Sequence, residues 1–288
     1  MRRIWMRVFS SRWKNAAAEF MAAVISNEGG YYDAFAYVSE SRRMGLRVLP
    51  ADVNASERAY TGRARELRVG LMQVKGLHAD AIRTLGAARE RGGAFRCFDD
   101  LKRRTRLHTA DLERLVKSGA CDSIACGSTR AELLWQLYLD QHAASSATGT
   151  DDLFAPPAPA APRAAPYDRA TMLRHEIESL GFLVSAHPVE PYQRAMRGQG
   201  IVHGRDLDRH VGRRIRLLGW HVTSKLVNDK HDRLMEFVGF EDTTALYDAT
   251  FFPKVYDRVC HLLAGNRPFL ITGQVQQEYG VTSVVVED

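Results

Sequence analysis

Residues 71–78 read Leu-Met-Gln-Val-Lys-Gly-Leu-His, and further along the chain residues 115–120 read Leu-Val-Lys-Ser-Gly-Ala. In each stretch, apolar residues at helical spacing lead into a lysine and a glycine, and another helical pattern follows. A glycine hairpin that opens a helix directs unpaired backbone N–H groups outward, where they suit a phosphate. The two stretches therefore predict tandem helix-hairpin-helix units that hold duplex DNA by its backbone. The predicted contacts are Lys75, Gly76, His78, Lys117 and Gly119.

The two hairpin glycines also fit a simpler interpretation. A glycine just past the last turn is the commonest way to end a helix, so Gly76 and Gly119 could serve only as helix caps. His78 also stands where a second hairpin glycine would be usual. From the residues alone, both interpretations stay open.

The excess positive charge of the chain lies in its first half. The 288 residues have a formal net charge of +6. Residues 1–145 carry 24 basic against 16 acidic side chains, whereas residues 146–200 and 201–288 each hold one more acid than base. A phosphate backbone is the commonest partner of a basic surface, because neutralising the phosphates releases counterions. A solvated basic face fits the charge equally well.

Composition excludes several classes of protein. A hydrophobic content of 45% is ordinary for a folded globular chain. There is no run of about 18 apolar residues, so no membrane span is predicted. The four cysteines are few and irregularly spaced, which predicts reduced thiols in a cytoplasmic protein. Cys121 and Cys126 have no second close Cys or His pair beside them, so no metal site is predicted.

The hydrophobic period divides the chain. From residue 16 to about 141 the pattern is helical, which predicts an all-α region, and the Ala/Pro-rich residues 143–166 predict an extended linker. A short helix from about Asp168 to Leu180 follows. A period of two then predicts strands at 213–224, 233–240, 246–252, 268–277 and 281–287, with a helix near 255–263. Five strands with a helix between the third and fourth have the order of an OB-type barrel. The predicted fold class is therefore α+β multidomain, an all-α helix-hairpin-helix region followed by a small OB-type β-barrel.

Aromatic and basic side chains along the predicted strands suit single-stranded DNA. Exposed aromatic rings stack on bases and nearby cations bind phosphates. The candidates are Trp220 and Phe237 for stacking, and Arg216, Lys225 and Arg233 for phosphates, with Tyr247 and Phe251 as further rings. Most aromatic rings of a small barrel belong to its core, which is the alternative for each of them.

The linker holds one apolar pair. Asp152, Leu153 and Phe154 lie in an Ala/Pro/Ser stretch that offers no local core for two large side chains. They fit a short anchor for a partner's hydrophobic groove, or a segment that folds back on the neighbouring helices.

No catalytic constellation is visible. Phosphoryl transfer by a polymerase needs acidic side chains that hold two divalent ions. Adjacent acids occur at Asp99-Asp100 and at Glu241-Asp242, and one Asp-x-Asp pair, Asp206-Leu207-Asp208, lies between two histidines, where a solvated turn is the simpler interpretation. We therefore predict no catalytic residues, no metal ligands and no cofactor for this chain.

A set of stretches in fixed order resembles one known family. The stretches are residues 18–23, 37–46, 48–54, 68–76, 115–123, 180–188 and 235–256. Together they closely resemble bacterial C-family DNA polymerases, above all the DNA polymerase III alpha subunit, replicative or error-prone, from the end of its fingers onward. The resemblance runs from about Ala18 to the last residue.

The resemblance implies roles. The hairpin pair would hold the duplex leaving the polymerase, and the barrel would handle single-stranded template. Residues 150–154 fall where the family has a sliding-clamp-binding peptide, with Thr150 in place of the usual Gln. The family's palm, which carries the catalytic aspartates and Mg²⁺, would lie before Met1. The palm and the rest of that catalytic portion would then be a partner.

The implied divisions are a divergent basic leader (1–17), the end of the fingers (18–65), the tandem hairpins (66–142), the linker (143–166), a connecting helical segment (167–210) and the OB domain (211–288). The implied function is DNA binding as the C-terminal part of a polymerase, in replication or translesion synthesis. A stand-alone, clamp-tethered accessory protein that has lost polymerase activity is the alternative.

Overall fold

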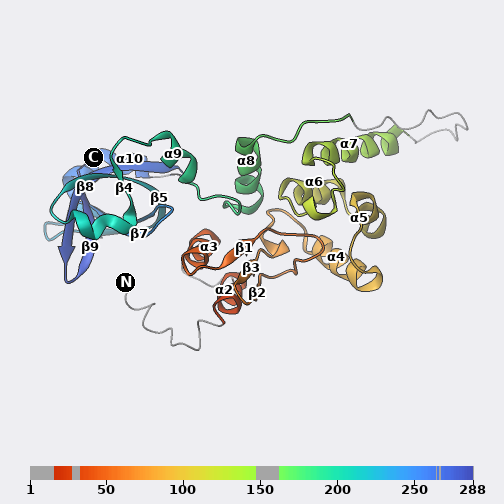
Figure 1. Cartoon of the computed structure of the whole chain (residues 1–288), viewed down its shortest axis with the longest axis horizontal. Helices are drawn as coiled ribbons and strands as arrows, with labels where there is room; N and C mark the ends of the chain where they lie inside the picture. The colour runs from red at the N-terminus through yellow and green to blue at the C-terminus, as the bar shows by residue number, and fades with distance from the viewer. Residues whose placement is uncertain (1–15, 28–32, 147–161, 264, 266, 288) are drawn as a thin grey trace, which may run out of the picture. The chain divides into compact units, whose positions relative to one another are not determined.

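A computed structural model describes residues 16–27, 33–146, 162–263, 265 and 267–287. By its internal contacts the chain divides into two compact units, residues 1–185 and residues 186–288 (Figure 1). None of the helices formed by the described residues is long and apolar enough to cross a bilayer.

The first unit is mostly helical. Its elements are α2 (Ala17–Ser26), α3 (Ala34–Arg43), η2 (Leu71–Gln73), α4 (Ala79–Gly92), α5 (Phe98–Thr105), α6 (Thr109–Lys117), η3 (Asp122–Ile124), α7 (Arg130–Ser146) and α8 (Arg169–Leu180), together with three short strands. The predicted short helix is confirmed as α8. The Asp168 carboxylate caps its start by accepting the Thr171 N–H, and Gly181 ends it with a φ of +84°.

The prediction of an all-α region from residue 16 to about 141 is wrong in one place. Strands β1 (Arg47–Leu49), β2 (Thr61–Arg63) and β3 (Glu66–Arg68) form a small sheet in the order β1-β3-β2. Strand β3 pairs in parallel with β1 and antiparallel with β2, and helices α2 and α3 pack against the sheet (Figure 1). Strands of three residues are too short for a period of two to show in the sequence.

One apolar core joins the elements of the first unit. Leu67 of β3, Leu85 of α4, Leu101 of α5, Leu115 of α6 and Leu180 of α8 are all fully buried in it. Because α8 shares this core, the segment that follows the linker is fixed to the hairpin region. It places the α8 end beside the first hairpin.

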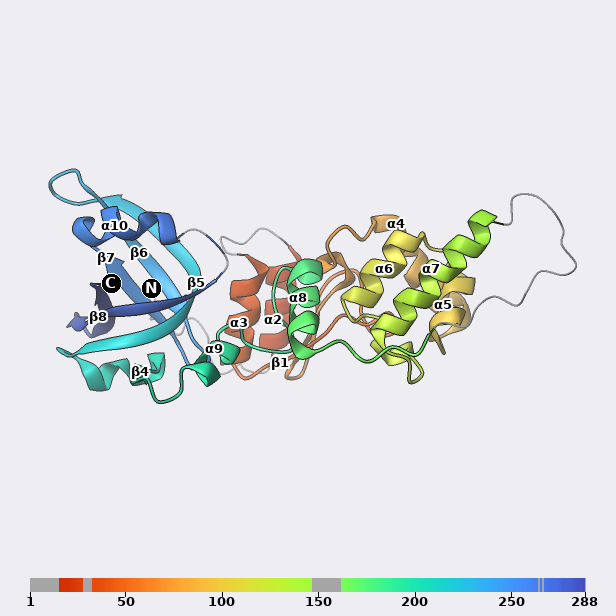
Figure 2. The ribbon, with the colours of Figure 1, turned by 90° about the horizontal axis from the view of Figure 1, so that it is seen from above.

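The second unit is built on a six-stranded sheet. Its strands are β4 (Ile201–Val202), β5 (Arg214–Asn228), β6 (Leu234–Glu241), β7 (Leu246–Phe251), β8 (Pro268–Glu278) and β9 (Val281–Val286). The strand order is β4-β5-β6-β7-β9-β8, and β5 also pairs with β8, so each strand from β5 to β9 pairs with at least two others. The remaining elements are α9 (Glu190–Ala195), η4 (Gly204–His210) and α10 (Pro253–Leu263), of which α10 lies across β6 and β7 (Figure 2).

The predicted strands and their order are confirmed. Strands β6 to β9 begin and end within one residue of the prediction, and β5 continues to Asn228. The core forms around the fully buried Phe240. The centroid of its ring lies 5.6 to 6.3 Å from the ring centroids of Phe269, Tyr247 and Phe251. A mixed α+β fold is therefore shown, and the OB-type arrangement of the strands stays a prediction.

Candidate nucleic-acid interface

The first hairpin is a tight turn between η2 and α4. The Leu77 N–H donates to the Val74 carbonyl at 3.1 Å, and Gly76 occupies the third position of the turn with a φ of +73°. A turn of this kind requires a positive φ at that position, which glycine adopts without strain. Gly76 is therefore a turn residue and does not cap a regular helix.

The turn and the start of α4 leave a row of backbone donors open. Within the described part of the chain, the N–H groups of Gly76, Ala79, Asp80 and Ala81 have no acceptor, and the first helical bond of α4 runs from Ile82 to His78. His78 precedes the helix in extended conformation, and its side chain does not cap the helix. Because Gly76, Ala79 and Asp80 are exposed, their N–H groups are available to an anion.

Hydrogen bonds to the last residues of α8 fix the inner side of the turn. The Lys75 N–H donates to the Ser179 carbonyl at 2.7 Å, and the Gln73 side-chain amide donates to the Leu180 carbonyl at 2.6 Å. The Gln73 side-chain oxygen in turn accepts the hydroxyl of the buried Tyr60 at 2.9 Å. These bonds fix the turn against the core while its outer side stays exposed.

Two predicted contacts, Lys75 and His78, are exposed, and the end of the Lys75 side chain lies beside Gly181 at the end of α8, where an added Cβ atom would be 3.2 Å from its Nζ. The exposed Lys75 ammonium has no carboxylate within ion-pair distance among the described residues. The His78 ring Nδ1 lies 2.9 Å from Oδ1 of Asp111, a carboxylate of α6 that is 1% exposed. Sequence analysis missed Asp111, because nothing in the sequence relates a residue near the start of α6 to a turn 33 positions earlier.

The second hairpin has a different geometry. Gly119, with a φ of +82°, directly follows the end of α6, where its N–H donates to the Val116 carbonyl and the Ala120 N–H donates to the Leu115 carbonyl. This pair of bonds defines a Schellman cap, which satisfies the last carbonyls of a helix. Gly119 and its neighbours Ser118 and Ala120 are buried. At the second hairpin the helix-cap interpretation therefore describes the geometry.

The helix that follows the second hairpin, α7, begins with two backbone donors satisfied by side chains, whereas the Arg130 and Ala131 N–H groups have no acceptor among the described residues. Thr129 and Glu132 form a capping box: the Thr129 N–H donates to Glu132 Oε2 at 2.9 Å and the Glu132 N–H donates to Thr129 Oγ1 at 3.2 Å. Arg130 closes the hairpin with two bonds to the Asp122 carboxylate, from Nε at 2.8 Å and from Nη2 at 2.5 Å. The sequence Thr-Arg-Ala-Glu carried the signal of this cap.

Lys117, a further predicted contact, is engaged within its own helix. Its ammonium lies 2.6 Å from the Glu113 carboxylate, four residues earlier on α6. The hydrogen bond from Lys117 lowers the pKa of Glu113, and the same bond raises the pKa of Lys117. The charge of Lys117 is thus compensated, unlike that of Lys75.

In the second unit, a β-bulge brings three predicted residues to one face of the sheet. Lys225 of β5 pairs directly with Phe237 of β6, and Trp220 pairs with Glu241, so these side chains share a face. In a regular strand Trp220 and Lys225 would point to opposite faces, because they are an odd number of residues apart. The irregularity between His221 and Thr223 reverses that alternation.

The two ends of this face differ. Phe237 is 44% exposed and Lys225 is exposed, whereas the Trp220 end lies under the segment before β4. There Glu241 bonds to His187 at 3.2 Å, and Arg216 donates to the Gln199 carbonyl. Arg233 sits in the β5–β6 turn and pairs with Asp229. Lys225 and Phe237 are therefore the accessible pair, and Tyr247 and Phe251 are buried in the core.

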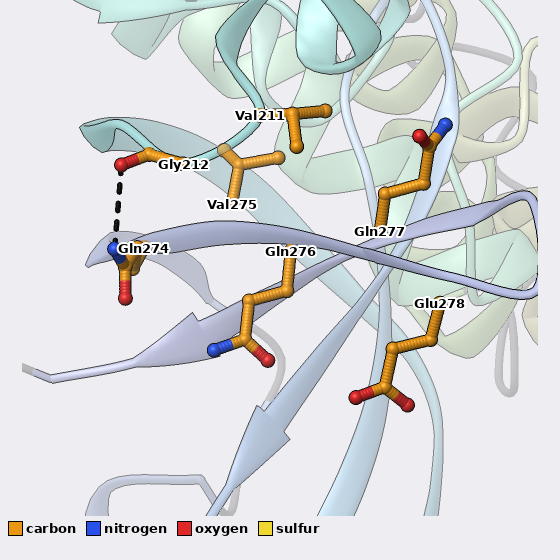
Figure 3. Close-up of a pocket in the computed structure, with 7 residues that line it drawn as sticks. All are labelled: Val211, Gly212, Gln274, Val275, Gln276, Gln277 and Glu278. Carbon is orange, nitrogen blue, oxygen red and sulfur yellow. Dashed lines mark hydrogen bonds between the residues drawn. The ribbon is translucent and has the colours of Figure 1, made fainter.

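A shallow groove of about 410 Å³ runs along β8 (Figure 3). Gln276 and Glu278 point to one side of the strand and Gln277 to the other, where Val211 lies, while the Gln274 amide donates to the Gly212 carbonyl at 3.3 Å (Figure 3). The groove is lined by amides, one carboxylate and two valines. It brings together no pair of groups suited to acid–base or nucleophilic chemistry.

The acidic Asp-x-Asp pair has separate partners. Asp206 accepts from Arg209 at 3.2 Å, whereas Asp208 accepts from the Thr282 hydroxyl at 2.5 Å. In the described ranges, no three His, Cys, Asp or Glu side chains are grouped so as to hold a metal ion. The four cysteines are free thiols. The predicted clamp-binding residues Asp152, Leu153 and Phe154, and most of the basic leader, lie outside the described residues.

The chain is similar to a known motif family and to several known proteins. A helix-hairpin-helix motif family matches residues 45–133, which confirms the predicted helix-hairpin-helix region. The DNA polymerase III subunit alpha of Saccharopolyspora erythraea is 28% identical over 95% of this chain and 25% of its own length. The corresponding subunit of Thermus aquaticus is 30% identical over 90% of the chain and 22% of its own length. The error-prone DNA polymerase of Symbiobacterium thermophilum is 28% identical over 93% of the chain and 29% of its own length.

The chain is homologous to bacterial DNA polymerase III alpha subunits and error-prone DNA polymerases. The region of those proteins that it matches is C-terminal. It spans about a quarter of the length of the polymerases it matches. The family resemblance noted in the sequence is thereby confirmed.

Proposed function

We propose that the chain binds DNA as the C-terminal part of a DNA polymerase III alpha-like subunit. The two hairpins would hold the duplex backbone, the first through Lys75, Gly76 and His78 as the main contacts and the second through Lys117 and Gly119 as lesser ones. The observation that carries this proposal is the exposed turn and helix start, where the N–H groups of Gly76, Ala79 and Asp80 have no acceptor among the described residues and Lys75 has no carboxylate partner. Backbone donors and a cation suit a phosphate whatever the base sequence.

The second unit, as an OB-type domain, would bind single-stranded DNA. Phe237 would stack on a base, and the lysine paired across from it, Lys225, would neutralise a phosphate. Arg216, Trp220 and Arg233 complete the proposed set, although each already has another interaction. We therefore expect Phe237→Ala to weaken single-strand binding more than Trp220→Ala.

We propose no catalytic step for this chain, because Asp206 and Asp208, the one Asp-x-Asp pair noted in the sequence, bond to Arg209 and to Thr282. The polymerase chemistry would belong to a catalytic portion that acts with this chain. Primer extension by the purified protein with nucleotides and Mg²⁺ would contradict this part of the proposal.

The linker would bind a sliding clamp through Asp152, Leu153 and Phe154. Capture of the full chain on an immobilised clamp should be lost when Leu153 and Phe154 are both replaced by alanine. Capture that survives the double substitution would remove this assignment.

Fluorescence-anisotropy titration of the full chain tests DNA binding. Duplex, primed and single-stranded oligonucleotides would be titrated at several salt concentrations. We expect affinity to fall as salt rises, with a slope of about −0.9 for each phosphate contacted in duplex DNA. Affinity that ignores salt, or dissociation constants above about a millimolar near physiological salt, would refute the proposal, because even non-specific binding is tighter than this.

A further inference from the structure

The guanidinium of Arg114 lies directly over the first hairpin. A Cβ atom added to Gly76 would lie 2.9 Å from Arg114 Nε and 3.4 Å from Arg114 Nη2. Arg114 belongs to α6, the first helix of the second hairpin unit, so it reaches the turn from another part of the fold. A side chain at residue 76 would push the guanidinium away, which adds a second reason for glycine there.

Only one edge of this guanidinium is satisfied by the protein. Arg114 Nη1 donates to Asp111 Oδ1 at 3.3 Å, whereas Nε and Nη2 have no acceptor within the described ranges. The open edge lies beside the Gly76 N–H, which also has no acceptor. Two donors in a planar fork, with a backbone N–H on the neighbouring turn residue, suit the oxygens of a phosphate.

The buried carboxylate of Asp111 fixes this arrangement. Its Oδ1 atom accepts from Arg114, from the His78 N–H at 3.4 Å and, at 2.9 Å, bonds to the His78 ring. One atom therefore links the turn of the first hairpin to α6, the first helix of the second hairpin unit. The acid exposed at the start of α4, Asp80, is paired with Arg83, so its charge is offset.

We propose that Arg114 is a phosphate ligand of the first hairpin and that Asp111 is its positioning residue. The ligand would be one phosphodiester group of duplex DNA, held by Arg114 Nε and Nη2 with the Gly76 N–H as a neighbouring donor. The two hairpin units then form one site. The first hairpin contributes backbone N–H groups, and the second hairpin contributes the Arg114 side chain. This inference rests on the proposed DNA binding and names a ligand that the sequence pattern does not mark.

Salt-dependent anisotropy on the full chain tests the proposal. Arg114→Ala should weaken duplex binding by about tenfold and reduce the salt slope by about one, as expected for one lost phosphate contact. Arg114→Lys should retain the slope and lose about threefold, because it keeps the charge and loses the fork. Arg114→Gln, of similar size, should resemble alanine, and urea unfolding would verify that each variant folds.

Arg103 provides a matched control. It is an arginine paired with an aspartate three residues earlier, as Arg114 is, but on α5 and with its neighbour Asp100. Arg103→Ala should lose less than twofold. Equal losses at Arg103 and Arg114, with equal slopes, would show diffuse charge attraction and overturn the assignment of Arg114.

A double-mutant cycle tests the positioning role. Asp111→Asn should weaken binding in the wild-type background and have little further effect when Arg114 is already alanine, because both changes remove the same contact. Additive losses would refute positioning through Arg114. If the wild-type chain does not bind duplex at all, the proposed function fails. If Lys75→Ala weakens binding while Arg114→Ala does not, only this inference fails.

Discussion

The two hairpins share a Lys-x(0–1)-Gly pattern and a glycine with positive φ, yet the first is open and the second is closed. At Gly76 the backbone donors face solvent, and His78 does not cap the helix that follows. At Gly119 the donors bond to the preceding helix, and the next helix carries its own capping box. Gly119 thus serves the fold, whereas Gly76 would serve the proposed phosphate ligand. The two hairpins differ in whether carbonyl groups of the protein accept hydrogen bonds from the N–H groups of the hairpin.

The largest expected difference concerns stability. Gly119→Ala should lower the free energy of unfolding of the first unit by about 2–3 kcal/mol, since it combines left-handed strain with a clash. Its Cβ would collide with Arg130 Nη2 and break the Arg130–Asp122 pair. Gly76→Ala should cost only about 1 kcal/mol, because in this exposed turn its Cβ meets only the end of the long Arg114 side chain, which can shift. Urea unfolding of the full chain would measure both.

Gly86 supplies the control for these substitutions. It lies within α4, and a Cβ added there has no atom within 4 Å. Gly86→Ala should therefore stabilise the helix by about 0.5–1 kcal/mol. A Gly76→Ala variant that loses as much stability as Gly119→Ala would erase the distinction between an open and a closed hairpin.

A smaller effect separates the two lysines. Lys75→Ala should weaken duplex binding by about five- to tenfold, because a lone exposed ammonium neutralises phosphate at no cost in broken ion pairs. Lys117→Ala should lose about twofold or less, because its ammonium is already paired with Glu113. Anisotropy titration at one fixed salt concentration is sufficient. Equal losses would mean that both hairpins contact the duplex alike.

Periodic features of this fold could be predicted from the sequence, and features made by distant contacts could not. The alternation from residue 213 onward located β5 to β9 and α10, because each element is long enough to show its period. The three-residue strands of the first unit and the bulge after His221 have no such signal. At the site, Gly76 and Gly119 were found from their local pattern. Asp111 and Arg114 were not, because their role depends on how α6 packs beside a turn.

The smallest expected effect is a change in one carboxyl pKa at the closed hairpin. The hydrogen bond from Lys117 holds the pKa of Glu113 below its ordinary value of 4.5. Because the pKa is lowered in the folded state, the pair stabilises the fold fully above the ordinary pKa of 4.5. This contribution is lost as the pH falls from about 4.5 through the lowered pKa. Lys117→Ala should raise the pKa of Glu113 toward 4.5 and cost only about 0.3–0.5 kcal/mol, as expected for a pair at this spacing.

Carboxyl NMR titration of the full chain would follow Glu113 directly, and Lys75→Ala is the matched variant. Lys75 has no carboxylate partner among the described residues, so its removal should leave the Glu113 titration unchanged. If Lys117→Ala also leaves that titration unchanged, Lys117 is not held by Glu113 in solution. Its ammonium would then be as free for a phosphate as that of Lys75, and the charge difference between the hairpins would disappear while their backbone difference remained.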